Sequence, residues 1–231
     1  LPGIIFFIVE RNFKNNENEN GHSNNTHNSL KNNDVYGFPY KVGIISFCLI
    51  FIIMVIFYFI STNYSFYLSQ FAVENELLIG LAIATSSIAA GFISLFYKFL
   101  KKFLTFELIF ILALLFLGSG YTCISLAPTF YIVVLGSAIM GLGWGTFMPN
   151  ITNWLLKYTP LKFRGRVYGI FTTLAYLGQF FSPIISQPII NACNLSSLYL
   201  IGGIVLYLLL FVPVGLIISR QIRKKTNNNE E

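Results

Sequence analysis

Charged residues are scarce in this chain of 231 residues, at 10% of the total, whereas soluble domains carry about 25%. Hydrophobic residues make up 55% and aromatic residues 17%. These values exclude an ordinary soluble domain. The net charge of +6 does not indicate nucleic-acid binding, because the basic residues stand at the ends of apolar segments, as in membrane proteins. The composition therefore predicts a protein that lies in the lipid bilayer.

Cysteine and histidine are also rare, and their spacing excludes several kinds of site. Cys48, Cys123 and Cys193 have no CxxC spacing, so no disulfide framework or redox centre is predicted. His22 and His27 both lie in an asparagine-rich stretch, and we expect no metal site there. The sequence has no His–Glu pair, nucleophile elbow or phosphate loop. We therefore predict no catalytic residue and no cofactor, and we expect that the chain is not an enzyme.

Long apolar runs replace the missing charges, and their length favours membrane-spanning helices over a β-barrel. The predicted fold class is an all-α membrane protein, a bundle of six transmembrane helices over residues 42–219. The six predicted segments are residues 42–61 (with a polar extension to about residue 68), 79–97, 106–126, 131–156, 167–190 and 197–219.

The remaining segments flank this bundle. Residues 1–10 are predicted to be the end of a preceding transmembrane helix, so we expect the chain to be part of a longer protein. Residues 11–41 are rich in asparagine and cannot bury enough apolar surface to offset their ordering entropy. They are predicted to be a disordered central loop. Residues 220–231 form a basic tail.

The basic residues predict the orientation of the bundle. They occur before the first segment, between the second and third, between the fourth and fifth, and after the sixth, whereas the other three connections contain none. Lys and Arg favour the cytoplasmic side. The loop and the tail are therefore predicted to be cytoplasmic, in a multi-pass protein of the plasma membrane. The acidic residue nearest to membrane depth is Glu107, which we interpret as an interfacial carboxylate paired with neighbouring lysines.

Residues 136–169 combine glycines, a proline and a short basic loop in an otherwise apolar stretch. Gly141 and Gly145 form a small-xxx-small face that allows a neighbouring helix to approach closely. Pro149 is tolerated when neighbouring helices, side chains or water satisfy the carbonyl that it leaves without a donor. Together with Gly143, these residues are predicted to serve helix packing and bending.

Polar and aromatic side chains on the apolar helices are the candidates for a binding cavity. The predicted cavity residues are Tyr58, Asn63, Trp144, Asn150, Tyr176 and Gln179. A buried amide without a partner is costly, so each amide either bonds between helices or lines a wet cavity. Both alternatives are open at this stage. A cavity of this composition would suit a moderately apolar solute.

Three motifs carry a resemblance to a known family. They are GSAIMGLGWGTFMPN at Gly136–Asn150, PLKFRGRVYG at Pro160–Gly169, and YLGQFFSP at Tyr176–Pro183. The chain resembles the C-terminal half of a major facilitator superfamily transporter, and it is most similar in pattern to bacterial drug-efflux and sugar-efflux members. The stretch Gly91–Phe103 departs from the family, because it lacks the Asp and the second Gly of a charged loop motif.

The resemblance implies alternating access and proton-coupled export of drugs or similar amphiphiles. It supports Asn63, Trp144, Asn150 and Gln179 as cavity residues, and Arg164, Gly165 and Gly169 as conformational residues. The implied partners are the lipid bilayer, a small-molecule substrate and an N-terminal six-helix half, which would hold the proton-carrying acid. Nucleic acid is not among them. The alternatives are a sugar or metabolite permease and a membrane sensor or scaffold that transports nothing.

Overall fold

The computed structural model describes residues 40–71 and 76–218. The predictions for residues 1–39, including His22 and His27, and for residues 219–231 lie outside the described residues. Within the described part, the first helix begins at Tyr40, two residues before the predicted boundary.

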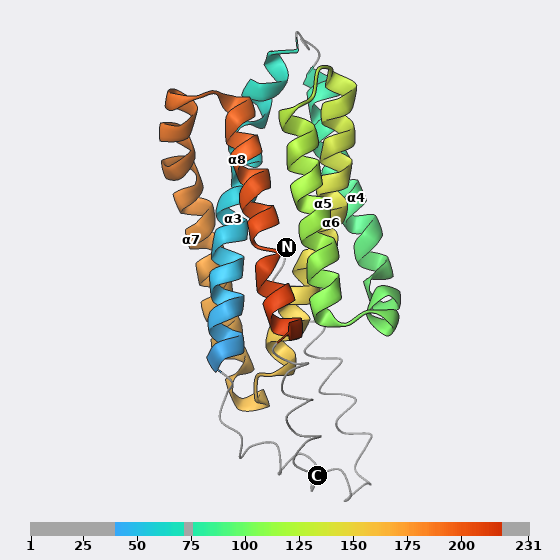
Figure 1. Cartoon of the computed structure of the whole chain (residues 1–231), viewed down its shortest axis with the longest axis vertical. Helices are drawn as coiled ribbons and strands as arrows, with labels where there is room; N and C mark the ends of the chain where they lie inside the picture. Colours follow the sequence, from blue (N-terminus) through green and yellow to red (C-terminus); the bar gives the residue numbers. More distant parts are fainter. Residues whose placement is uncertain (1–39, 72–75, 219–231) are drawn as a thin grey trace, which may run out of the picture. The chain divides into compact units, whose positions relative to one another are not determined.

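The described residues form six long helices joined by short connections (Figure 1), which confirms the predicted fold class. They are α3 (Tyr40–Ser69), α4 (Glu76–Phe103), α5 (Phe106–Ser125), α6 (Phe130–Lys157), α7 (Arg164–Ala192) and α8 (Leu195–Leu208). A short 3-10 helix, η1 (Leu161–Phe163), precedes α7. Two helices begin at capping side chains: Thr105 accepts from the Leu108 N–H, and Asn194 accepts from the Ser197 N–H.

The helix ends differ from the predicted ones where polar residues continue a helix. The second predicted segment ends at residue 97, but α4 runs on to Phe103 and carries Lys101 and Lys102 in its last turn. Lysine has a high helix propensity, and its charge is favourable at the carboxyl end of a helix. The apolar run therefore underestimates the length of this helix.

The sixth segment is interrupted near Pro213. The helix α8 ends at Leu208, and helical structure resumes over residues 211–218. Proline has no N–H to donate to the carbonyl four residues earlier, that of Leu209. This carbonyl instead accepts from the Val212 N–H at 3.1 Å, in a tighter turn.

One of the six helices is less apolar than the rest. Among the described residues, five helical segments are long and apolar enough to cross a membrane: Val42–Ser69, Leu77–Phe103, Phe106–Ser125, Phe130–Lys157 and Leu195–Ile218. The helix α7 is 29 residues long but is not among them. It carries Thr172, Thr173, Gln179 and Gln187. We therefore expect α7 to face protein or water along part of its length.

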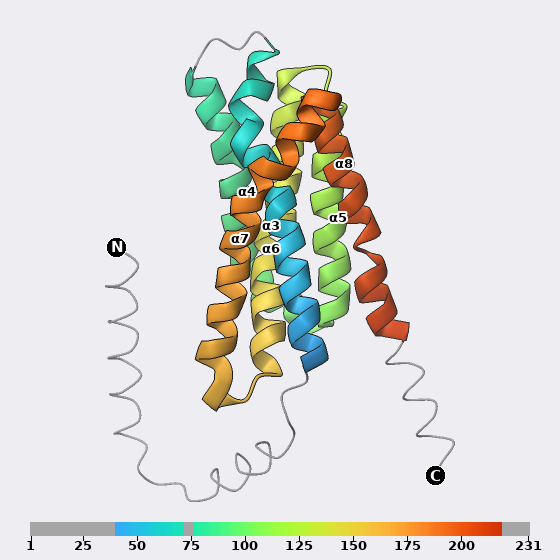
Figure 2. The same cartoon turned by 90° about the vertical axis from the view of Figure 1, so that its left-hand side faces the viewer.

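The helix α6 lies between α4 and α5, while α3 packs on α7 and α8 contacts α5 (Figures 1 and 2). A methyl group on Gly141 would lie 2.1 Å from the Ser86 carbonyl oxygen of α4. One on Gly143 would lie 2.6 Å from the Leu117 nitrogen of α5. Only glycine leaves room for backbones this close, so α6 contacts both neighbours through its glycines.

Tyrosine side chains connect α3 to the rest of the bundle. The Tyr64 hydroxyl lies 2.5 Å from the Ser137 Oγ of α6, and the Tyr67 hydroxyl donates to the Ile124 carbonyl of α5 at 2.6 Å. In the opposite direction, the Tyr121 hydroxyl of α5 donates to the Ile56 carbonyl of α3. All three bonds are buried, where an unpaired hydroxyl would be unfavourable.

The two ends of the helices differ in charge. The α4–α5 and α6–α7 connections lie at one end, and the α5–α6 and α7–α8 connections lie at the other (Figures 1 and 2). We call the first the basic end. Seven basic residues belong to the helix ends and connections there: Lys98, Lys101, Lys102, Lys157, Lys162, Arg164 and Arg166.

Candidate functional site

A pocket of about 150 Å³ lies among α3, α4 and α6. Each of the three helices contributes side chains to its wall, so residues that are distant in sequence lie close together in the pocket. The lining residues are Phe57, Ile60, Ser61, Tyr64, Ile83, Ser86, Ser87, Ser137 and Met140. We call this the hydroxyl pocket, because five of these nine residues carry a hydroxyl group.

One wall of the hydroxyl pocket is closed and hydrogen-bonded. Tyr64 and Ser137 are buried, at 4% and 1% exposure, and share the 2.5 Å contact between α3 and α6. The Ser137 Oγ also donates to the Val133 carbonyl at 2.9 Å. These bonds hold both oxygens in fixed positions, so they offer a solute fixed polar groups.

Other lining residues of the pocket are exposed. Ser61 of α3 and Ser87 of α4 are exposed, and none of the nine described lining residues is charged. A neutral pocket with apolar walls and several hydroxyls suits a solute that is largely apolar and carries a few hydrogen-bonding groups.

An aromatic stack borders the pocket. The ring of Trp144 on α6 stacks on Phe57 of α3 with centroids 4.0 Å apart and an interplanar angle of 15°. Tyr58 contacts Phe57 edge-on at 5.5 Å. Two of the predicted cavity residues, Tyr58 and Trp144, therefore lie beside a wall of the hydroxyl pocket, although neither lines it.

The structure places Asn150 elsewhere, at the basic end. It is fully buried, donates to the Phe106 carbonyl of α5 at 2.9 Å, and accepts from the Tyr97 hydroxyl of α4 at 3.1 Å. Of the two alternatives for a buried amide, this is bonding between helices, and it joins α4, α5 and α6.

The other predicted cavity residues are also separate from the hydroxyl pocket. Asn63 is buried at 5% exposure and donates to the Phe59 carbonyl of its own helix at 3.1 Å. On α7, Tyr176 is 72% exposed and Gln179 is half-buried. The six predicted residues thus do not form one pocket, and their role in binding stays a prediction.

Pro149 and its surroundings form a contact between α4 and α6. A proline at this position cannot donate to the Gly145 carbonyl. The Ser94 hydroxyl of α4 lies 2.8 Å from that carbonyl and 2.7 Å from the Ala90 carbonyl of its own helix, so its one O–H is shared between the two. A methyl group on Gly145 would lie 2.1 Å from the Ala90 carbonyl oxygen. Ser86, Ala90 and Ser94 are each four residues apart, so they form the matching face of α4.

The predicted conformational residues near the α6–α7 connection do not pack as closely as the glycines of α6. A methyl group on Gly165 or Gly169 would meet nothing within 4 Å, so close packing does not explain a glycine there. Arg164 begins α7, and its Nε donates to the Thr159 carbonyl at 3.2 Å. This bond fixes the guanidinium beside the basic end.

Sequence reasoning did not select the residues of the hydroxyl pocket. Tyr64 and Ser137 are 73 residues apart. Ser137 lies within the motif at Gly136–Asn150 but was not selected as a cavity residue, and Tyr64 belongs to none of the three motifs. Thr85, Ser86 and Ser87 interrupt an apolar run in the sequence, but spacing does not reveal their partners on α3 and α6.

Comparison with known proteins places this bundle in a family. The family model of the Major Facilitator Superfamily matches residues 42–231. The chain belongs to this superfamily. The match includes all the described helices, so the hydroxyl pocket lies within the region that is characteristic of the superfamily. A multi-pass membrane protein follows from this match and from the five apolar helices.

One relative of the chain is the multidrug efflux pump Tap of Mycolicibacterium fortuitum. It is 27% identical over 139 residues, which is 60% of this chain and 34% of the relative. The matched part of the chain thus spans about a third of the length of that pump.

Proposed function

We propose that the chain is the C-terminal half of a secondary transporter and that the hydroxyl pocket is part of its substrate site. The hydroxyl pocket is the observation that carries this proposal, because it lies inside a membrane-spanning bundle of the superfamily. In such transporters the substrate binds near the midplane between two repeats, and one rocks against the other. The protein is thus a carrier of the plasma membrane and not an enzyme.

An N-terminal six-helix half is the proposed partner. The coverage of the matched relative supports this, because the match extends over 34% of that pump. Several large apolar side chains of α4 and α7 are also exposed, including Leu95 at 81% and Phe180 at 64%. A second half and the lipid would cover these faces.

The proposed activity is proton-coupled export of drugs or other amphiphilic solutes. The name of the matched relative and the neutral, partly apolar pocket support this activity. None of the nine described lining residues of the pocket is an acid, a lysine, an arginine or a histidine. We therefore assign the proton-carrying acid to the N-terminal half, and we expect Glu107→Gln to leave the coupling unchanged.

A pair of serine substitutions tests the site. Ser61 and Ser65 are both exposed serines on α3, four residues apart, but only Ser61 lines the pocket. The accumulation of a fluorescent amphiphilic dye is measured in cells that express the complete protein, with and without a proton uncoupler. We expect lower accumulation that the uncoupler abolishes, a several-fold loss of export for Ser61→Leu, and wild-type export for Ser65→Leu.

A metabolite carrier is the second candidate, and the five hydroxyl groups of the pocket favour it because they could bond to the hydroxyls of a sugar. Dye accumulation equal to that of empty cells, with the protein present in the membrane, would contradict drug export and favour this carrier. Dye export that both serine variants retain unchanged would contradict the site. A sensor or scaffold predicts that no variant changes any flux.

A further inference from the structure

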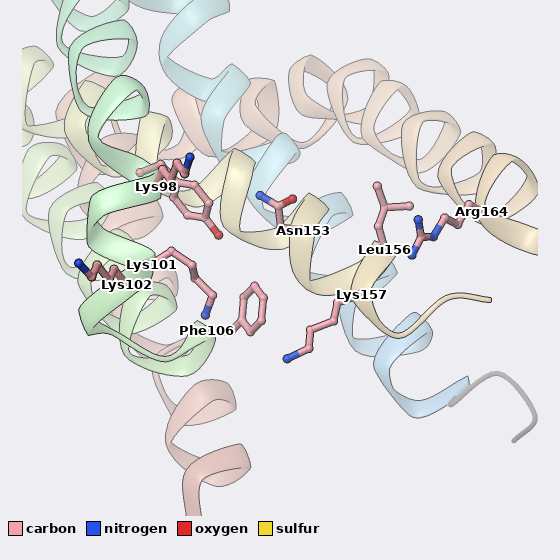
Figure 3. A pocket seen from close by; sticks show the side chains of 9 residues that line it. Lys98, Lys101, Lys102, Phe106, Asn153, Leu156, Lys157 and Arg164 are labelled. Atoms are coloured by element: carbon pink, nitrogen blue, oxygen red, sulfur yellow. The ribbon is translucent and has the colours of Figure 1, made fainter. Parts of the chain in front are cut away.

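A second and larger hollow, of about 740 Å³, lies at the basic end (Figure 3). Its walls come from the end of α4, the start of α5, the end of α6 and the start of α7. Five of its nine lining residues are basic: Lys98, Lys101, Lys102, Lys157 and Arg164. We call it the basic hollow.

Positive charge is in large excess there. The described acidic residue at this end is Glu107, which follows Phe106 in the first turn of α5 and is 2% exposed. Five cations and this one carboxylate leave four positive charges around a single hollow. Like charges around one hollow repel one another, so a bound anion would lower the electrostatic free energy of the site.

Three of the five cations are held in place by neighbouring groups. The Lys101 ammonium lies 3.2 Å from the centroid of the Phe106 ring, and the Lys157 ammonium lies 5.3 Å from it. Figure 3 shows this ring between the two side chains. Cation–π attraction thus keeps two ammonium groups from different helices near one point. On the α7 side, the bond to the Thr159 carbonyl holds Arg164.

Apolar rings stand beside the charges. On the last turns of α4, Phe96, Phe99 and Phe103 are 49%, 64% and 66% exposed. Their i, i+3, i+7 spacing puts them on one face of α4, and the lysines of the hollow occupy another face of the same turns. A ligand that used both features would have an anionic head and an apolar tail, whereas a soluble anion would use only the lysines.

We propose that the basic hollow binds the phosphate headgroup of an anionic phospholipid, with its acyl chains against the rings of α4. The hollow lies at the ends of membrane-spanning helices, where headgroups are found. Basic pockets between such helices are suited to acidic headgroups. The volume is sufficient for a ligand of this size.

The test compares two double variants of the complete protein that remove the same charge. Lys98→Gln with Lys157→Gln removes two cations that line the hollow, from α4 and α6. Lys162→Gln with Arg166→Gln removes two cations at the same end that do not line it. Each protein is purified in detergent, and the binding of phosphatidylglycerol and of phosphatidylcholine is measured by native mass spectrometry.

We expect wild type and the control pair to bind phosphatidylglycerol more tightly than phosphatidylcholine. One basic residue contributes about a fivefold change in affinity for an anionic lipid, so the hollow pair is expected to bind it about 25-fold more weakly. Lys98→Arg with Lys157→Arg keeps both charges and should retain binding. This third protein separates loss of charge from loss of folding.

Three outcomes would overturn the proposal. Equal binding by the hollow pair and the wild type would show that the hollow holds no lipid, and equal losses in both pairs would show a general surface attraction. Displacement of phosphatidylglycerol by inorganic phosphate at equal concentration would identify a soluble-anion site.

Discussion

A single hydroxyl, that of Ser94, replaces a backbone hydrogen bond that Pro149 removes. The Gly145 carbonyl has no N–H donor at residue 149, and the Ser94 hydroxyl of the neighbouring helix, shared with the Ala90 carbonyl, lies 2.8 Å from it. A proline inside a spanning helix is thus tolerated here by a side chain of another helix. The same bond joins α4 to α6.

This arrangement predicts non-additive effects of two substitutions. Ser94→Ala leaves the Gly145 carbonyl without its donor and should lower the stability by about 1 kcal/mol. In a Pro149→Ala background the N–H of residue 149 is restored, so Ser94→Ala should have a much smaller effect. Melting temperatures of the four proteins in detergent measure the coupling. Equal losses in both backgrounds would contradict the role of Ser94.

Substitution by alanine should have different effects at Gly141 of α6 and at Gly91 of α4. A methyl group on Gly141 would meet the Ser86 carbonyl oxygen at 2.1 Å, whereas one on Gly91 would meet nothing within 4 Å. Gly141→Ala should therefore destabilise the protein by about 1–3 kcal/mol, and Gly91→Ala should leave its melting temperature unchanged or slightly raised. Similar melting temperatures for the two variants would refute the close contact.

At the scale of elements, the sequence predicts where the helices lie along the chain but not which helices pack against each other. Apolar runs predict six helices because spanning segments must satisfy their own backbone groups. The predicted ends differ from the observed ones where lysines extend α4 and where the sixth segment is interrupted near Pro213. The glycine face of α6 was predicted from spacing, but its partner, the face of α4 at Ser86 and Ala90, depends on tertiary packing.

The polarity of α7 predicts that it enters the membrane poorly without its neighbours. Polar residues raise the free energy of insertion of an isolated helix. In a glycosylation-based insertion assay, residues 167–190 alone should insert inefficiently, whereas residues 42–60 from α3 should insert fully. Replacing Thr173 and Gln179 by leucine should raise the insertion of the α7 segment. Full insertion of the unmodified segment would contradict this interpretation.

At the scale of the whole molecule, the sequence predicted the family and fold class but only the surroundings of the candidate site. Trp144 and Tyr58 lie beside the hydroxyl pocket because they flank Phe57. Asn150 was selected as a cavity residue, but the structure gives it two interhelical bonds. Whether a polar residue faces a cavity or a partner helix depends on contacts between distant segments. Such contacts cannot be read from a single sequence.

The charge distribution predicts the orientation of the bundle. The helix α7 has 29 residues and is about 43 Å long, so Cys193 at its end and Lys162 before its start lie on opposite sides of a bilayer core of about 30 Å. A membrane-impermeant maleimide should label Cys193 in intact cells when the other cysteines are serine. Lys162→Cys, with Cys193→Ser, should react only after permeabilisation. The reverse pattern would place the basic end outside.

The tyrosine bonds between α3 and α5 have a consequence for how this sequence can change over time. In both, the acceptor is a main-chain carbonyl, at Ile124 for Tyr67 and at Ile56 for Tyr121. Every amino acid supplies such a carbonyl, so substitutions at the two isoleucines keep the bonds as long as the packing holds. The two tyrosines have no such freedom. Among homologues, we expect the residue type to vary at positions 56 and 124 and to remain tyrosine at positions 67 and 121.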